Sequence, residues 1–448
     1  MKNKVKLTTG LNYFLAAFLF AALIACTKNS DYSNGPNGEA NSKISGRVTE
    51  SGGLKSASLK SGQAVAGVQG ATVIIAEVQA NGTLNTVSTQ SVQTDVDGKF
   101  VIETKMSGTK NLVVVATKNM SEWKTVVSSE VKSGTTVYAQ PLNTETTAEA
   151  EVYARLIATG KTNVISQTDV QLYVNADVAA QIKGNASAQD QFISSLEVAA
   201  QAKTKASGNS YFGISNSQLQ AITTANAQAQ ADFEAALYHA DDSQSADEEK
   251  FDNFQKAIVS AYANANVKAE TYAKLSTISS KAFVNGAASM SSPIYFASAE
   301  SNYLRVAFIM RQAMEAKFQE AGASSTQSSA VVSAGANLTS SIKSSVSLNQ
   351  IADAFVQYHN SIIAQLKLTM SGYVNAIDMM DASINGNVGI KAILNGAIGA
   401  TVSTDAIVNA YVNFSNSCKA LVQTNMSSAM STQVNTASEI LLLANMNN

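Results

Sequence analysis

The spacing of apolar residues changes at Asn143, and this change constrains the fold more than any other feature of the chain. Before Asn143, short apolar runs alternate with turn residues, which is typical of β-strands. After it, alanine becomes frequent and apolar residues recur at three- and four-residue intervals, which is typical of helices that cover a core. The sequence therefore predicts a multidomain β + α protein, in which a small N-terminal β-sandwich precedes a large, mostly antiparallel all-α helical bundle over residues 143–448.

Short strands are expected throughout residues 43–142. Gly, Asn and Ser separate them, and these residues favour turns. Six or seven strands in roughly a hundred residues favour two stacked sheets. The segments with strand character are 44–48, 71–76, 86–94, 100–102, 111–117, 123–127 and 131–142.

Three motifs in this region resemble those of a known family. They are Ile44-Ser45-Gly46-Arg47-Val48, Val68-Gln69-Gly70-Ala71-Thr72-Val73 and Thr94-Asp95-Val96-Asp97-Gly98-Lys99-Phe100. Together they resemble the carboxypeptidase-regulatory-like domain, a transthyretin-type β-sandwich that is common in exported proteins of Bacteroidetes. The resemblance covers residues 43–142 and implies a non-catalytic accessory or spacer role. The loop Glu50–Val65 is longer and richer in Ser and Gly than is usual in that family.

Asp95 and Asp97 raise the question of a calcium-binding loop. When Gly98 is aligned with the glycine of an EF-hand loop, Gln93 and Thr104 fall at the first and last ligand positions. The last position requires a glutamate that binds calcium through both oxygens, so the pattern fails. We therefore expect Asp97-Gly98 to reverse the chain in a turn.

Two long apolar stripes indicate helices in residues 143–448. One stripe runs from Phe251 to Leu275 and the other from Ile351 to Met380. They predict roughly eight to ten helices, several of about 25 residues or more, packed as an antiparallel bundle. A solenoid is disfavoured because the chain has no repeat of fixed length.

Helix-boundary signals recur in the same region. Ser292-Pro293 predicts an N-cap at Ser292 followed by proline at the first helical position, and Gly322 predicts the end of that helix. Capping boxes, in which a Ser or Thr precedes an acid or amide by three residues, are possible at Thr146–Glu149, Ser215–Gln218, Ser245–Glu248 and Ser347–Gln350.

Residues 388–400 are apolar and rich in small side chains, within a weakly charged C-terminal part of the chain. The main interpretation is a central helix hairpin that is buried on most sides. A protein interface and a segment that inserts into a membrane are the alternatives. Lys391 and Asn395 interrupt the segment, which is shorter than the roughly 20 apolar residues that a membrane-spanning helix needs.

The N-terminus has the pattern of an export signal. Three lysines precede an apolar run from Leu11 to Ile24, which is too short and too early for a stable spanning helix. Leu23-Ile24-Ala25-Cys26 resembles the bacterial lipobox. The resemblance implies a signal peptide over residues 1–25, cleavage before Cys26, and lipidation of Cys26. Several acyl chains, at about 0.8 kcal/mol per buried methylene, would make that anchor permanent in practice.

Residues 26–42 are polar and predict a lipidated, flexible tether. Lys28 does not match the aspartate that retains lipoproteins in the inner membrane, so we expect the protein at the outer membrane. The sequence leaves open whether it faces the periplasm or the cell surface.

Charge and cysteine content exclude some classes of function. The chain has 31 basic and 33 acidic residues, which is too little positive charge for a nucleic-acid-binding protein. Charged residues make up 14% of the chain, against roughly 25% in typical soluble domains. The second cysteine, Cys418, has no partner for a disulfide within the chain if Cys26 carries lipid, so packing must supply the stability.

The sequence assigns no catalytic, cofactor-binding or metal-binding residue. His239 precedes Asp241 and Asp242, but no second His or Cys lies at the spacing of a metal site. His359 follows Tyr358 in the second apolar stripe, and we expect it on the flank of that helix.

The leading hypothesis is a lipid-anchored cell-envelope protein that is not an enzyme, with the sandwich as spacer and the helical bundle as interaction domain. Its expected partners are membrane lipid through Cys26, an envelope protein or glycan, and a second copy of the chain through the weakly charged C-terminal helices. One alternative is a membrane-active, toxin-like protein that acts through residues 388–400. Another is an envelope enzyme that uses carboxylates of the bundle, such as Glu149, Glu151, Asp169, Asp241 and Glu315.

Overall fold

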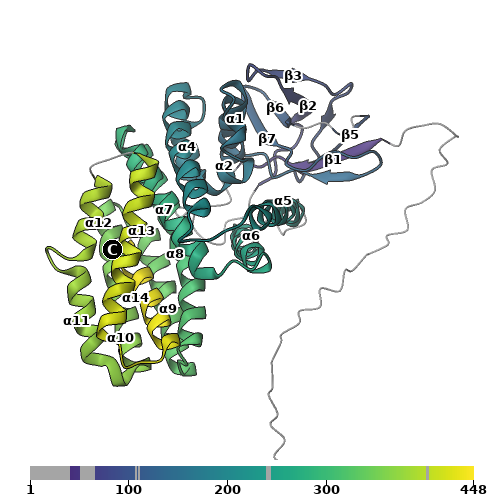
Figure 1. The fold of residues 1–448 in the computed structure, drawn as a ribbon. Coiled ribbons are helices and arrows are strands. Elements are labelled where there is room, and N and C mark those ends of the chain that lie inside the picture. The colour runs from purple at the N-terminus through teal and green to yellow at the C-terminus, as the bar shows by residue number, and fades with distance from the viewer. Residues whose placement is uncertain are drawn as a thin grey trace, which may run out of the picture. The chain divides into compact units, whose positions relative to one another are not determined.

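The computed structural model describes residues 41–50, 66–105, 108, 111–238, 244–399 and 403–447, without the side chains of residues 244–248. Strands occupy the first part of this chain and helices the remainder, so the predicted fold class is confirmed (Figure 1). The predicted signal peptide, Cys26 and most of the tether lie outside the described residues. So do nearly all of the loop Glu50–Val65 and the group His239, Asp241 and Asp242.

The β-region consists of two sheets. One has the order β5-β1-β8, in which β1 pairs antiparallel with β5 and parallel with β8. The other has the antiparallel order β3-β2-β6-β7, and β4 also pairs with β2. The strands are β1 (Ser42–Arg47), β2 (Thr72–Val78), β3 (Leu84–Thr86), β4 (Val92–Gln93), β5 (Lys99–Thr104), β6 (Leu112–Lys118), β7 (Ser121–Val126) and β8 (Thr136–Tyr138).

The sheet β3-β2-β6-β7 is covered on both faces. Val114 points into the core between the two sheets, whereas its neighbours Val113 and Val115 pack with Ala150 of helix α1 (Thr144–Ala158). Because both faces are buried, β6 is a continuous apolar run rather than an alternating one. The first helix and the sandwich therefore share a hydrophobic core, and α1 lies against β7 in Figure 1.

The Asp95 segment forms the expected turn between β4 and β5. Asp95 Oδ1 accepts hydrogen bonds from the backbone N–H of Asp97 at 3.0 Å and of Lys99 at 2.8 Å. Gly98 has a φ of 76°, and a Cβ at this position would lie 2.3 Å from the carbonyl oxygen of Val48. The turn therefore needs glycine for both its backbone conformation and its close approach to Val48, the residue that follows β1.

The helical region contains more helices than predicted, and most of them are shorter. Among the described helices only α8 exceeds 25 residues, with 29. After α1 they are α2 (Gln167–Tyr173), α3 (Ala176–Ile182), α4 (Ala186–Gly208), α5 (Asn216–Tyr238), α6 (Gln244–Asn264), α7 (Ala269–Gly286), α8 (Ser292–Glu320), α9 (Ser325–Lys343), α10 (Leu348–Thr369), α11 (Val374–Asn385), α12 (Ile390–Gly399), α13 (Thr404–Asn425) and α14 (Ser431–Asn445).

Both apolar stripes continue across a break between two helices. The first crosses from α6 to α7 through Asn266, which has a left-handed φ of 57°. The second crosses from α10 to α11 through the 3₁₀ turn Ser371–Tyr373. Apolar spacing persists because the helices on either side of each break cover the same core, so periodicity alone overestimates helix length.

Several predicted helix boundaries are confirmed. Ser215 and Gln218 form the capping box, with Gln218 Oε1 accepting from the Ser215 N–H at 2.9 Å. Ser347 caps α10. After α8, Gly322 adopts a φ of 79°, and the N–H of Ala323 bonds to the Phe318 carbonyl at 2.9 Å, as in a Schellman motif. Helix α8 begins one residue earlier than predicted, with Ser291 at the N-cap position and no side-chain hydrogen bond there. The start of α1 also differs from the prediction.

Asn143 rather than Thr146 caps α1. The Asn143 side chain accepts from the Thr146 N–H at 3.0 Å, and the Thr146 hydroxyl accepts from the Asn143 N–H at 3.0 Å. The N-cap of α1 therefore lies three residues before the predicted one, Thr146, because an asparagine side chain can also cap a helix. The predicted box at Ser245–Glu248 involves side chains outside the described residues.

The interpretation of residues 388–400 as buried on most sides is wrong. In α12, Leu394 and Ile398 are 3% and 6% exposed, but Ile393 is 70% exposed and the preceding Val388 is 92% exposed. One stripe of this small helix packs on α13 and α11, and the rest lies at the surface. None of the described helices has both the length and the apolarity needed to cross a membrane.

Candidate functional site

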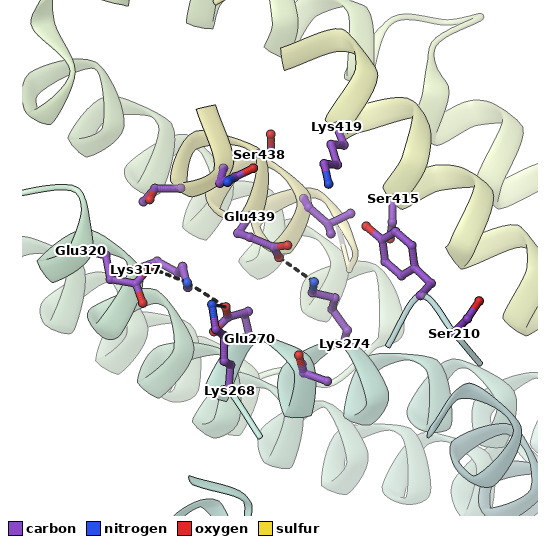
Figure 2. Close-up of a pocket in the computed structure, with 15 residues that line it drawn as sticks. Ser210, Lys268, Glu270, Lys274, Lys317, Glu320, Ser415, Lys419, Ser438 and Glu439 are labelled. Carbon is purple, nitrogen blue, oxygen red and sulfur yellow. Dashed lines mark hydrogen bonds and ion pairs between the residues drawn. The ribbon is translucent and has the colours of Figure 1, made fainter. Parts of the chain in front are cut away.

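A polar cavity of about 530 Å³ lies among helices α7, α8, α13 and α14 and residues 210–211, which connect α4 to α5 (Figure 2). We call it the lysine–glutamate pocket. Its charged lining consists of Lys268, Lys274, Lys317, Lys419, Glu270, Glu320 and Glu439. The volume is in the range of pockets that bind small molecules, although such pockets are usually more apolar.

One side of the pocket is built on a buried ion pair. Lys317 Nζ of α8 lies 2.7 Å from Glu270 of α7, and the two side chains are 3% and 7% exposed. Glu320 also binds Lys317 Nζ at 2.6 Å, and Lys268 lies 4.0 Å from Glu270. Burial lowers the pKa of Lys317, but its bonds to Glu270 and Glu320 outweigh burial, and the net pKa is raised. Lys317 is therefore held as a cation.

A second ion pair lies one helical turn further along α7. Glu270 and Lys274 share a helix face because they are four residues apart. Lys274 Nζ lies 2.7 Å from Glu439 of α14, and their side chains are 6% and 25% exposed. The same ammonium lies 5.8 Å from the ring centre of Tyr211, at the upper end of the distance for a cation–π contact. The pair thus fixes α7 against α14 at the pocket wall.

Lys419 differs from the other lysines of the pocket. It is exposed on α13, and it has no ion pair among the residues that the structure describes. In Figure 2 its side chain points toward the Lys274–Glu439 pair. With four lysines against three glutamates, the lining carries one uncompensated positive charge.

Neutral polar groups complete the lining. Within the described part of the chain, the side chains of Ser210, Thr271 and Asn435 form no hydrogen bond, so they are available to a ligand. The first turn of α7 also borders the pocket, and the residue before it, Lys268, provides no side-chain cap. The unpaired N–H groups at a helix N-terminus favour a nearby negative charge.

The carboxylates considered for an enzyme are not assembled into this pocket. Glu149 is buried in α1. Glu151 accepts from the Gly184 N–H at 2.8 Å. Asp169 forms a capping box with Ser166 at the start of α2, and Glu315 lies half-buried on α8. Asp241 lies outside the described residues.

The expectation that His359 lies on the flank of its helix is wrong. The residue is 4% exposed, and its Nε2 lies 3.1 Å from Asp381 Oδ1 of α11. Asp381 belongs to α11, which follows the unpredicted break after α10. A single long helix through both segments would not bring His359 and Asp381 together, so the sequence did not indicate this pair. In the described residues, no group of three or more His, Cys, Asp or Glu side chains is placed to hold a metal ion.

A second polar cluster lies where α5 meets the β-region. Ser128 accepts from the side-chain amides of Gln167 at 2.6 Å and Gln230 at 2.5 Å, and it donates to Glu234. Glu234 is 0% exposed. Burial raises its pKa to about 8, with a further increase from Glu149, although the bonds from Ser128 and Gln230 oppose the shift. We call this the Ser128–Glu234 cluster.

Cys418 precedes Lys419 in the sequence, but it is not one of the residues that line the pocket. It is 1% exposed on α13, and burial raises its pKa to about 12. A thiol that stays protonated at neutral pH is a poor nucleophile.

No known protein family matches the chain, and no curated protein or solved structure shows significant similarity to it. The resemblances to the lipobox and to the carboxypeptidase-regulatory-like domain therefore remain predictions from the sequence.

Proposed function

We propose that this protein is a non-catalytic binding protein of a bacterial cell envelope. In this proposal lipid on Cys26 holds the chain at the outer membrane, and the helical region binds a small polar ligand in the lysine–glutamate pocket. The lipobox-like sequence Leu23–Cys26 supports the anchor.

The observation that carries the binding role is a pocket whose walls are fixed before any ligand arrives. Lys317–Glu270 joins α8 to α7, and Lys274–Glu439 joins α14 to α7. Side chains that are already held in place lose little further freedom on binding, and this reduces the entropic cost of association. A preformed polar cavity therefore favours a ligand whose own polar groups match the lining.

The state of Lys317 favours binding over catalysis. A lysine that acts as a nucleophile or base needs a lowered pKa so that the neutral amine is present. The pKa of Lys317 is raised instead, because its two carboxylate partners outweigh the effect of burial. Lys317 is thus suited to hold charge in place and not to transfer a proton.

The binding role is tested by retention of a ligand. The mature chain from residue 26, with Cys26→Ser, is incubated with a soluble envelope extract and separated by gel filtration, and the small molecules released on denaturation are identified by mass spectrometry. We expect one small polar compound at near-stoichiometric amount and chemically unchanged. Ser210→Trp, which fills the pocket from an exposed rim position, should abolish retention, whereas Ser361→Trp on the exposed face of α10 should not.

Retention that is equal in the Ser210→Trp variant would place binding elsewhere, and conversion of the retained compound would contradict a non-catalytic role. The anchor is tested separately by feeding cells a clickable fatty acid. We expect label and outer-membrane fractionation for the wild type and neither for Cys26→Ala.

A further inference from the structure

We propose that the ligand of the lysine–glutamate pocket is a monocarboxylate with several hydroxyl groups, such as a uronic acid, and that Lys419 binds its carboxylate. This inference rests on the proposed binding function and specifies the chemistry of the ligand.

The charge of the lining indicates an acidic ligand. Four lysines face three glutamates, so a ligand with one negative charge would make the occupied pocket neutral. A neutral ligand would leave the surplus positive charge without a partner, and a dianion would replace it with a surplus negative charge. Removing charges from water is costly unless opposite charges compensate them, so a monoanion fits best.

Lys419 is the lysine available for that carboxylate. Glu270 and Glu439 occupy the other three, with Lys317 and Lys268 beside Glu270 and Lys274 beside Glu439. Lys419 points toward the Lys274–Glu439 pair (Figure 2). A carboxylate between the ammonium groups of Lys419 and Lys274 would continue the alternation of charge and accept charge-assisted hydrogen bonds from both.

The hydroxyl groups of the ligand are inferred from the neutral lining. Ser210, Thr271 and Asn435 come from a loop, α7 and α14, and their side chains make no hydrogen bond within the described residues. They offer donors and acceptors on several sides of one cavity. Tyr211 is half-buried at the same wall, and its flat ring gives a surface for the C–H groups of a sugar ring.

Isothermal titration of the mature chain from residue 26, with Cys26→Ser, tests the inference. The probes are D-glucuronate and D-galacturonate, the neutral sugars D-glucose and D-galactose, and acetate as an acid without hydroxyl groups. We expect at least one uronate to bind roughly tenfold or more tightly than its neutral counterpart and than acetate. The preference should weaken as salt concentration rises, because the added contact is between charges.

Three variants locate the contact. Lys419→Gln should weaken uronate binding by about tenfold or more and leave binding of the neutral sugars unchanged. Glu320→Gln removes a negative charge that is 51% exposed, so it should tighten uronate binding by a few fold. Lys343→Gln makes the same charge change as the first variant at an exposed position of α9 that does not line the pocket, and it should have no effect.

Each other outcome overturns a stated part of the inference. Equal affinity for uronates and neutral sugars would exclude the carboxylate contact while leaving the binding function intact. Equal affinity for acetate would exclude the hydroxyl contacts. An unchanged affinity in Lys419→Gln would reject the role of Lys419. If no probe binds at millimolar concentration, the ligand class is wrong, and the retention experiment still decides the binding function independently.

Discussion

Glu270 and Glu234 are both buried glutamates of the helical region, but their surroundings are opposite. Glu270 lies 2.7 Å from the ammonium of Lys317, with a second lysine at 4.0 Å. Glu234 lies among the hydroxyl of Ser128 and the amide of Gln230, and no ion pair of Glu234 occurs within the described residues. Both side chains are buried, so the difference between them is the cationic partner that Glu270 has and Glu234 lacks among the described residues.

The contrast has a functional meaning. The lysine–glutamate pocket holds fixed charges beside a cavity, so it can recognise a charged ligand. The Ser128–Glu234 cluster joins α5 to the loop after β7 and to α2, and its carboxyl group is suited to be neutral below about pH 8. We therefore expect the pocket to respond to charge substitutions and the cluster to respond to pH.

The largest expected effect comes from removing the buried cation of the pocket. Lys317→Met leaves Glu270 buried beside a lysine that is 73% exposed and 4.0 Å away. An uncompensated buried charge typically costs about 3–5 kcal/mol of the free energy of unfolding. Urea denaturation followed by circular dichroism measures this loss. Lys343→Met, at an exposed position of α9, is the matched control with an expected change near zero.

The double variant Lys317→Met/Glu270→Met sharpens the same prediction. Removing both charges eliminates the unpaired carboxylate, so the double variant should be clearly more stable than Lys317→Met alone. If the losses of unfolding free energy from the two single substitutions simply add in the double variant, Lys317 and Glu270 are not coupled. That result would contradict a stabilising ion pair between them.

The next effect is the pH dependence of stability. The pKa of Glu234 is about 8 in the folded protein, against an ordinary value of 4.5, so the folded state holds an extra proton between these values. The free energy of unfolding should therefore fall as pH rises from about 4.5 to about 8 and change little above that from this residue. The total contribution is on the order of a few kcal/mol.

Glu234→Gln is the variant that isolates this effect. Glutamine keeps the shape without the titrating proton, so the variant should lose much of the slope in urea denaturations between pH 5 and about pH 8. Glu300, whose pKa burial raises to about 7 with help from Asp177, should account for a remaining slope of the same sign. A wild-type slope that Glu234→Gln leaves unchanged would show that Glu234 ionises normally.

The local features of the β-region and of the helical region could be predicted from the sequence. The strands follow from short apolar runs, the Asp95 turn from its Asp-Gly pair, and the end of α8 from Gly322, because these depend on neighbouring residues. Apolar periodicity overestimates helix length, because the stripe that spans α10 and α11 continues through the turn Ser371–Tyr373.

The lysine–glutamate pocket could not be predicted in the same way. Glu270 and Lys274 are neighbours on one helix, but their partners Lys317 and Glu439 come from distant parts of the chain. An i, i+4 pair of opposite charges ordinarily indicates an exposed helix face. The sequence alone does not show that α8 and α14 pack against the face of α7 that carries Glu270 and Lys274.

The Lys274–Glu439 pair should show an intermediate effect, because Glu439 is 25% exposed. A double-mutant cycle with Lys274→Met and Glu439→Gln should give a coupling energy of roughly 1–2 kcal/mol, smaller than that of Lys317–Glu270. A coupling energy larger for Lys274–Glu439 than for Lys317–Glu270 would contradict the expectation that the more buried pair is coupled more strongly.

The smallest effect is expected at the surface pair Lys205–Asp405, whose side chains are 43% and 69% exposed. The same cycle with Lys205→Met and Asp405→Asn should give less than about 1 kcal/mol, and this value should vanish in high salt. A coupling that persists in 1 M salt would contradict the assignment of this pair to the solvated surface.

The most direct test of the central claim is a crystal structure of the mature chain with whichever of D-glucuronate and D-galacturonate binds more tightly. We predict the ligand in the lysine–glutamate pocket, with its carboxylate within hydrogen-bonding distance of Lys419 Nζ and with the Lys317–Glu270 and Lys274–Glu439 pairs intact. A uronate bound outside this pocket, or one whose carboxylate points away from Lys419, would contradict the account.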